Sequence, residues 1–262
     1  MSQLKTALVT GASKGIGSST AMSLARAGFS VCINCREDIP GAEKTLSSMA
    51  DSAQDSFIFR ADVSDSREVD SMFSEIAGRW GRLDVLVNNA GIYERSHFTG
   101  IDFDGWRRTL SQNLDSVFLC TSRAVPMMMA QRHGRIINIS SQLAFKGSRH
   151  GAHYAASKAG MTGFTRSLAI ELGEYGITVN MIAPGSIRTG ILDSYSSEQF
   201  EELSIQIPAR RIGVPGTLRQ LPLSLHQMQR RMSTVPQSAY RAVCSFTDQS
   251  EKSTLFDRST GM

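Results

Sequence analysis

The sequence predicts an α/β protein with one doubly wound parallel sheet and helices on both faces. Three observations lead to this fold class. Short apolar segments alternate with longer helical ones along the 262 residues, as in parallel strands joined by crossover helices. A glycine-rich turn joins the first apolar segment to the first helical one. Polar motifs follow several of the apolar segments, and parallel sheets bind their ligands beyond the carboxyl ends of the strands.

The first three elements form a strand, a helix and a second strand. Residues 4–10 read Leu-Lys-Thr-Ala-Leu-Val-Thr, a short apolar strand. A helical run at 18–27 follows and ends at Gly28, as expected of a C-terminal glycine. Residues 29–35 form the second apolar strand. The unit therefore has the β-turn-helix-β order of a nucleotide-binding half-sheet.

The remaining elements continue the alternation. Residues 57–60 form a third strand that Asp62 and Val63 close, and 66–79 form a helix. The apolar run 83–87 is the fourth strand, and 103–132 is largely helical with a long apolar face. A fifth strand at 135–139, a long helix at 154–175 and a sixth strand at 178–182 follow. We expect residues 1–215 to form one domain.

The glycine-rich turn has the sequence Gly11-Ala12-Ser13-Lys14-Gly15-Ile16-Gly17. Glycines permit a tight turn and allow a pyrophosphate to approach the backbone, and the following helix offers free N–H groups at its positive end. A glycine turn alone is weak evidence, but here the strand before it and the helix after it supply the required context. The turn predicts dinucleotide binding.

Tyr154 and Lys158 stand four residues apart on a predicted helix, and Ser141 lies thirteen residues before the tyrosine. Positions i and i+4 share a helix face, so the ammonium lies beside the phenol. A positive charge favours the phenolate and lowers the pKa of a tyrosine from its usual value of about 10. Such a pair suits proton transfer at an alcohol oxygen. Taken alone, the spacing is equally typical of an ordinary exposed helix.

Together these motifs make the chain resemble the short-chain dehydrogenase/reductase family, a Rossmann fold. The matching segments, in chain order over about residues 4–215, are Thr10-Gly11-x-x-x-Gly15-Ile16-Gly17, Asn88-Asn89-Ala90-Gly91, the tetrad Asn113, Ser141, Tyr154 and Lys158, and Pro184-Gly185-Ser186-Ile187-Arg188-Thr189. The subgroup that it most resembles is the 3-oxoacyl-carrier-protein reductases, through His133-Gly134-Arg135-Ile136-Ile137 and Ala183-Pro184-Gly185.

The resemblance implies a role for each tetrad residue. Tyr154 would be the general acid in reduction and the general base in oxidation. Lys158 would bind the nicotinamide ribose and lower the tyrosine pKa. Ser141 would hold the substrate oxygen, and Asn113 would help to position Lys158 through a water. By the motif alone, a helix asparagine such as Asn113 is more often a solvent-facing residue.

The resemblance also implies a cofactor site. Asp62 and Val63 would flank the adenine, and Ile187 and Thr189 would fix the carboxamide. The full set of expected cofactor-binding residues is Gly11, Ser13, Lys14, Gly15, Ile16, Gly17, Arg36, Asp62, Val63, Asn89, Ala90, Gly91, Tyr154, Lys158, Pro184, Gly185, Ile187 and Thr189.

The end of the second strand favours NADP over NAD. NAD-preferring relatives carry an aspartate where this chain has Cys35, and Arg36 is available as a planar partner for a 2′-phosphate. Lys14 adds a second cation in the glycine turn. The alternative is that Glu37 and Asp38 pair with Arg36 instead.

Composition excludes several other classes. The net charge of +4 is concentrated in residues 216–262, which hold six Lys/Arg and three Asp/Glu. Without a basic stripe interleaved with aromatics we expect no nucleic-acid binding. Without an apolar run near 20 residues or a secretory signal we expect no membrane span and a cytoplasmic protein. Cys32 and Cys35 point to opposite faces of a strand, so we expect no metal.

Residues 216–262 depart from the family pattern. The family continues with a helix, a last strand and a glycine pair, whereas this segment is polar and has no sustained period. We therefore expect the last strand of the sheet to be missing or replaced. We hypothesise a frameshifted read-through, because permitted codons from Thr217 onward, read one base earlier, can encode a family-like ending. Met228 and Met232, with one codon each, allow only Asp, Asn, His or Tyr in that frame. The coding DNA tests this hypothesis.

The expected activity is an NADP-dependent interconversion of a ketone and a secondary alcohol, with a small or acyl-carrier-bound substrate. Arg132 is a candidate contact for an acidic carrier, although Tyr175 replaces a second basic residue that such reductases often have. A sugar, steroid or other small-alcohol dehydrogenase is the rival within the enzyme class, and a cofactor-binding protein without turnover the rival outside it. The family implies a homo-oligomer, but the altered tail would remove much of its usual contact.

Overall fold

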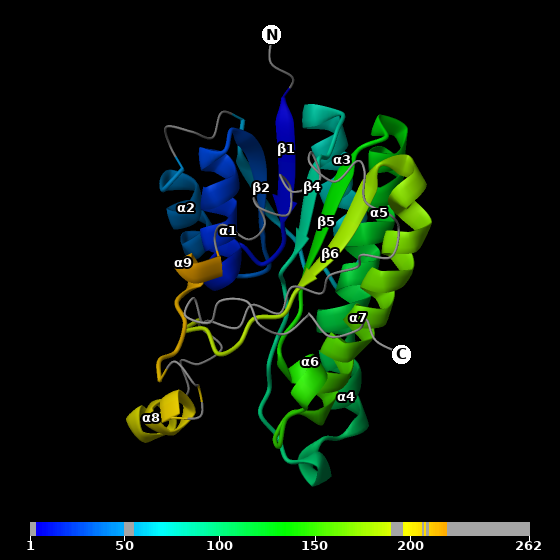
Figure 1. Ribbon diagram of the computed structural model, residues 1–262. Coiled ribbons are helices and arrows are strands. Elements are labelled where there is room, and N and C mark those ends of the chain that lie inside the picture. The colour runs from blue at the N-terminus through cyan, green and yellow to red at the C-terminus, as the bar shows by residue number, and fades with distance from the viewer. Residues whose placement is uncertain (1–3, 50–54, 190–195, 206, 208–209, 219–262) are drawn as a thin grey trace, which may run out of the picture.

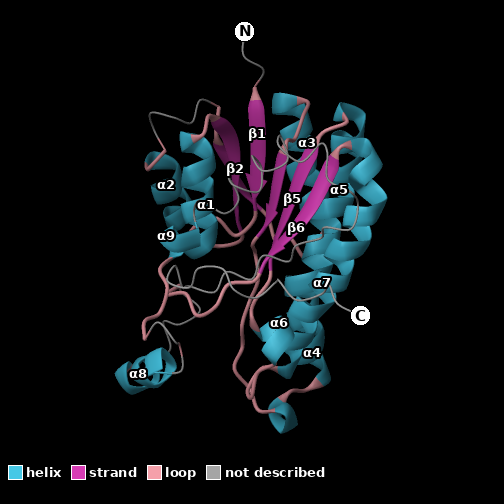
Figure 2. Cartoon of the chain, in the orientation of Figure 1, coloured by secondary structure: helices cyan, strands magenta, loops and turns pink. Residues whose placement is uncertain are grey.

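A computed structural model describes residues 4–49, 55–189, 196–205, 207 and 210–218, and it contains the predicted sheet. Six parallel strands lie in the order β3-β2-β1-β4-β5-β6 (Figure 2). Their bounds are β1 Lys5–Val9, β2 Phe29–Cys35, β3 Phe57–Arg60, β4 Val85–Asn88, β5 Gly134–Ile139 and β6 Ile177–Ile182. The order reverses between β1 and β4, so the crevice for a ligand opens beyond the carboxyl ends of these two strands.

The helices lie on both faces of the sheet, as Figure 1 shows. Helices α1 and α2 lie on one side, and α3, α5 and α7 lie on the other. The helices are α1 Gly15–Arg26, α2 Ile39–Ser47, α3 Ser66–Trp80, α4 Phe103–Leu110, α5 Ser116–Gln131, α6 Leu143–Lys146, α7 Ala152–Leu172, α8 Ser197–Ile205 and α9 Pro215–Leu218, with 3₁₀ turns at Phe98–Gly100 and Gly173–Tyr175.

Two apolar clusters hold the layers together, one on each face of the sheet. Successive strand residues alternate between them: Leu8 belongs to the cluster under α3 and α5, and Val9 to the cluster under α1. Cys32 and Cys35 are likewise split between the clusters and both are buried, as the strand period requires. In the described part of the chain, no group of three His, Cys, Asp or Glu side chains could hold a metal ion.

The helical stretch predicted over 103–132 is interrupted. Between α4 and α5 the turn Ser111–Asp115 is π-helical, a bulge that proteins often place at functional sites. Helix α2 was not predicted from the sequence. Asp38 caps the start of this helix, where its side chain accepts a hydrogen bond from the Gly41 N–H (3.0 Å). An aspartate cap followed by Pro40 at the second helical position is a recognisable helix start.

The C-terminal departure falls almost wholly outside the described residues. Of 216–262 only 216–218 are described, so neither the replaced last strand nor the frameshift hypothesis is tested by the structure. Within the described part, β6 is the last strand on its side of the sheet. Among the helices of that part, none combines the length and the apolar character that crossing a membrane requires.

Candidate active site

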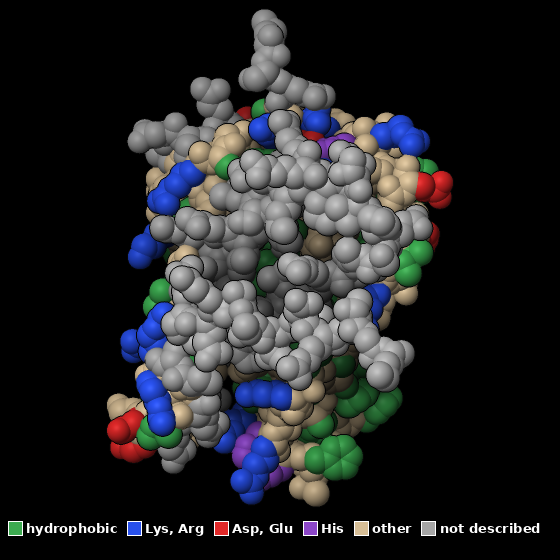
Figure 3. Space-filling view, viewed as in Figure 1, with side chains coloured by type: hydrophobic (Ala, Val, Ile, Leu, Met, Phe, Trp, Pro, Cys, Tyr) green, Lys and Arg blue, Asp and Glu red, His purple; other side chains and the backbone are tan. Residues whose placement is uncertain are grey.

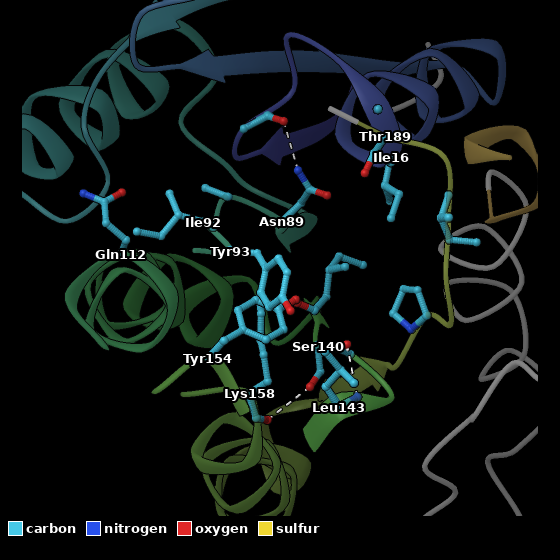
Figure 4. A pocket seen from close by; sticks show the side chains of 18 of the residues that line it. Ile16, Asn89, Ile92, Tyr93, Gln112, Ser140, Leu143, Tyr154, Lys158 and Thr189 are labelled. Carbon is cyan, nitrogen blue, oxygen red and sulfur yellow. Dashed lines mark hydrogen bonds between the residues drawn. The ribbon is translucent and has the colours of Figure 1, made fainter. Parts of the chain in front are cut away.

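A cavity of about 810 Å³ opens at the carboxyl ends of the strands. Its walls come from the turns after β1, β2, β4 and β5, from the first turns of α7 and from the segment after β6. Figure 4 shows Ile16, Asn89 and Thr189 at one side of it, and Tyr93, Tyr154 and Lys158 together at the other. The volume is in the range of pockets that enclose a small-molecule cofactor.

The glycine turn has the backbone that its sequence predicts. Gly11 and Gly15 adopt φ values of 60° and 61°, which side chains with a Cβ rarely adopt. A Cβ on Gly17 would overlap the Gly11 carbonyl and lie 2.5 Å from Asn89 Nδ2. Lys14 precedes α1 without capping it through its side chain, so the first N–H groups of the helix remain available to an anion.

Asn89 fastens this turn to the end of β4. Its Nδ2 donates to the carbonyls of Thr10 and Gly11, each at 2.9 Å. The N–H groups of Asn89 and Ala90 donate in return to Thr10 Oγ1 (2.9 and 3.0 Å). Two strand ends that are far apart in the chain are therefore held as one rigid wall of the cavity.

The end of β2 carries the charges that bear on cofactor choice. Arg36 pairs with Glu37 (Nε to Oε1, 3.0 Å) and lies 3.6 Å from Asp62 Oδ2. The Arg36 and Glu37 side chains are 47% and 74% exposed, so their pair adds little stability. The pairing with Glu37 that the sequence left open does occur, whereas Asp38 caps α2.

Asp62 is held as a carboxylate beside the same end of β2. Burial raises its pKa, but hydrogen bonds from Ser64 and Gln112 and the charge of Arg36 outweigh this, and the pKa is lowered overall. Gln112 Nε2 reaches both carboxylate oxygens at 3.2 Å. The side chain is thus fixed as an acceptor in the cavity wall.

The tyrosine and lysine project from the first turns of α7 into the buried end of the cavity, where Figure 4 labels both. Tyr154 is 8% exposed and Lys158 is 4% exposed. The Lys158 Nζ donates to the Ile139 carbonyl (2.9 Å) and lies 5.8 Å from the Tyr154 ring centroid. The Tyr93 ring packs edge-on against Tyr154 with centroids 4.9 Å apart.

Burial dominates the acid-base properties of this pair. It raises the pKa of Tyr154 to about 12, against a smaller lowering by the hydrogen bond with Ser141. Burial also lowers the pKa of Lys158 to about 8. The lowering of the tyrosine pKa by the lysine that the sequence predicted does not occur in the protein alone, because burial has the larger effect. By itself the protein keeps the phenol protonated at neutral pH.

Asn113 lies in the π-helical turn and is completely buried, so it is not the solvent-facing helix residue of the alternative interpretation. Its Oδ1 accepts from the Ile92 N–H (2.7 Å), and its Nδ2 donates to the Ile92 carbonyl (2.9 Å) and to Ser157 Oγ (3.2 Å). Ser157 in turn donates to the Tyr154 carbonyl (2.7 Å). The asparagine therefore joins the segment after β4 to the helix that carries the tyrosine.

The structure brings nearly all of the predicted site residues to one cavity. Of the predicted set, Gly17 and Asn113 do not line it and act on its wall through the contacts described above. The sequence reading missed Asn34, whose Oδ1 accepts from the Gly11 N–H (3.2 Å) and whose Nδ2 donates to the Ala61 carbonyl (3.0 Å). A polar residue near the end of a buried apolar strand is the signal that could have identified it.

These residues fit a dinucleotide. The φ > 0 glycines and the uncapped start of α1 form a backbone cradle for a pyrophosphate. The buried Lys158 holds an ammonium whose site lowers its pKa, and an adjacent hydrogen-bonding ligand would compensate for the lost hydration. The cavity connects both features.

Comparisons with known proteins agree with this geometry. The family model for short chain dehydrogenase matches residues 5–199. The 3-oxoacyl-(acyl-carrier-protein) reductase FabG of Staphylococcus aureus is 42% identical over 213 residues, which are 81% of this chain and 87% of the relative. Both alignments leave a substantial part of the chain unmatched.

Two solved structures share the fold over most of their length. One, described as a short-chain alcohol dehydrogenase from Sinorhizobium meliloti, has a TM-score of 0.80 and 34% identity, covering 84% of this chain and 88% of that one. The other, described as an NAD(P)-dependent gluconate 5-dehydrogenase from Beutenbergia cavernae, has NADP bound at low occupancy, a TM-score of 0.79 and 36% identity, with the same coverage. The chain therefore belongs to the short-chain dehydrogenase family of NAD(P)-dependent oxidoreductases.

Proposed function

We propose that the protein is an NADP-dependent reductase that converts a ketone to a secondary alcohol, with Tyr154 as the proton donor. The observation that carries this proposal is the buried Tyr154–Lys158 pair at the end of a cavity that begins in a phosphate cradle. Ketone reduction needs a hydride and a proton. NADPH, when bound, supplies the hydride, and residues of this chain donate the proton.

The phenol is suited to proton donation. With a pKa of about 12, Tyr154 is protonated at neutral pH and can give its proton to an oxygen on which negative charge develops. Ser141 forms a hydrogen bond with Tyr154, which supports a role for its hydroxyl in holding the same substrate oxygen. The ammonium of Lys158 favours the phenolate that donation leaves behind. Asn113 positions the tyrosine segment by its contacts with Ile92 and Ser157.

The preference for NADP over NAD rests on the end of β2. Cys35 and Arg36 line the cavity, and Cys35 supplies no carboxylate for a ribose 2′-hydroxyl. The ion pair of Arg36 with Glu37 is exposed, so a doubly charged phosphate can compete for the guanidinium.

For the substrate we propose a 3-oxoacyl group carried as a thioester, which is the substrate class in the name of the Staphylococcus aureus relative. A sugar-derived ketone is the rival, favoured by the likeness to the structure described as a gluconate 5-dehydrogenase. A panel of 3-oxoacyl thioesters, sugar ketones and steroid ketones, each assayed with NADPH and NADH, distinguishes these classes.

The test of the mechanism is Tyr154→Phe, which removes one hydroxyl from the buried end of the cavity. We expect the variant to bind NADPH, measured by the fluorescence of the dinucleotide, and to lose its turnover of ketones by at least about a hundredfold. Tyr175→Phe is the matched control, because Tyr175 lies in the 3₁₀ turn after α7 and does not line the cavity. Turnover that survives in Tyr154→Phe would remove the tyrosine from its role. Binding of NADPH without any turnover in the unsubstituted protein would favour a cofactor-binding protein.

A further inference from the structure

Two short segments, one after β4 and one between β5 and α7, contribute basic side chains to the cavity wall. The segment after β4 contributes Arg95, and the segment between β5 and α7 contributes Lys146, Arg149 and His150, all of which line the cavity. We refer to these four residues as the cationic mouth. Figure 3 shows Lys, Arg and His side chains gathered at the lower end of the molecule, where α6 and α4 lie in Figure 1.

Several contacts hold the two segments to each other. The Ser96 N–H donates to the His150 carbonyl (3.1 Å). The His97 ring packs edge-on against His150 with centroids 4.2 Å apart, and Arg95 Nη2 lies 3.2 Å from His150 Nδ1. A ligand in this part of the cavity would therefore meet a cationic mouth whose two segments are already held together.

The acidic residues that line the cavity come from other segments than the cationic mouth. The carboxylates that line the cavity, Glu37, Asp38 and Asp62, follow β2 and β3. In the described part of the chain, Arg149 and Lys146 form no ion pair. Burial and the charges of His97, Arg95 and Arg149 lower the pKa of His150, which is the effect expected of a positive field.

An exposed arginine is ordinarily solvated, and a single one at the edge of a cavity would not indicate a binding site. Here Arg95 on one segment and Lys146 and Arg149 on the other bring charges of one sign to the cavity wall, and together they attract an anion bound among them. The cationic mouth also lies near Tyr154. His150 is four residues before Tyr154, and Arg95 is two residues after Tyr93, whose ring packs against Tyr154.

We infer, on the basis of the proposed function, that the substrate carries an anionic group, a carboxylate or a phosphate, which the cationic mouth binds while the carbonyl lies at Tyr154. A neutral ketone of the same shape is a poorer ligand. A charged hydrogen bond from a guanidinium is the stronger kind. We therefore expect the anion to bind at least about tenfold more tightly than its neutral counterpart at low salt.

The experiment measures binding and turnover separately, using two pairs of probes that differ only in the anion. Acetoacetate is compared with its methyl ester, and the 3-oxobutanoyl thioester of phosphopantetheine with that of pantetheine. Binding to the protein in the presence of NADPH is measured by calorimetry with the Tyr154→Phe variant, which cannot consume the probe. Turnover is measured with the unsubstituted protein. The first pair tests a carboxylate and the second a phosphate.

Arg149→Gln and Lys146→Gln, separately and together, should reduce the preference for the charged member of the preferred pair to about threefold or less in the double variant. Arg67→Gln, an exposed arginine of α3 outside the cavity, is the control and should leave the preference unchanged. Equal binding of both members of both pairs, no binding of any probe, or a preference that the double variant retains would overturn the inference. A preference in binding without turnover in the unsubstituted protein would support the inference and refute the proposed reduction.

Discussion

The charge on the buried Lys158 lowers the free energy of unfolding, and this effect can be measured. Burial lowers the pKa of this lysine from 10.5 to about 8. A shift of this size corresponds to about 3 kcal/mol of differential free energy between the folded and unfolded chains. Replacing Lys158 by methionine keeps most of the apolar stem and removes the charge. The substitution also removes the hydrogen bond to the Ile139 carbonyl, which costs about 1 kcal/mol.

The Lys158→Met variant is therefore expected to be about 2 kcal/mol more stable than the unsubstituted protein at pH 7. The sign of the pH dependence follows from the two pKa values. Between pH 8 and pH 10.5 the unfolded chain keeps the lysine proton while the folded chain has released it. The stability of the unsubstituted protein thus rises with pH in this window. By pH 10 the advantage of the variant should fall to within about 1 kcal/mol of zero.

Urea unfolding at pH 7 and at pH 10 measures the two differences, and other titrating groups cancel because both proteins contain them. Lys44→Met, at an exposed position of α2, is the control, and its effect should stay within about 0.5 kcal/mol at both pH values. A Lys158→Met variant that is less stable than the unsubstituted protein by the same amount at both pH values would refute the reasoning, because the ammonium would then carry no burial cost.

Three further predictions concern catalysis and packing. The kcat/KM for ketone reduction should fall about tenfold per pH unit above about pH 8, as Lys158 loses its proton, and a profile that stays flat to pH 10 would contradict this. Gly17→Ala should lower the free energy of unfolding by about 1–3 kcal/mol, since its Cβ would meet Asn89 Nδ2 at 2.5 Å, whereas Gly78→Ala, in open space on α3, should be neutral or stabilising in the same urea titration. Cys35→Asp should shift the ratio of kcat/KM for NADPH over NADH towards NADH by at least about tenfold, and an unchanged ratio would show that the end of β2 does not select the cofactor.

The C-terminal segment stays a prediction. We propose that the dehydrogenase domain ends near residue 215 and that 216–262 derive from a frameshift, an idea that the charge, polarity and codon argument support. Sequencing the coding DNA decides it: codons that cannot encode a family-like ending in the second frame would exclude the frameshift.

The sequence by itself determined the architecture and the composition of the site. Alternating apolar and helical segments have few arrangements other than a parallel sheet covered on both faces. The turn at Gly11 to Gly17 has a conformation that depends on its own glycines. The residues that line the cavity could be predicted because the motifs follow strands, and parallel strands bring their carboxyl ends to one edge of the sheet.

The tertiary structure decided the energetics of the site. How much water remains around Tyr154 and Lys158 depends on the packing of Tyr93, α7 and β5, which no local pattern encodes. Burial is the largest cause of the pKa shift of both groups. The hydrogen-bond partners of Asn113 could not be predicted from the sequence either, because they lie on segments distant in the chain. For Arg36, the sequence could not show which of the neighbouring carboxylates forms the ion pair. Local preferences select the elements, whereas solvation and long-range contacts set the chemistry that those elements can perform.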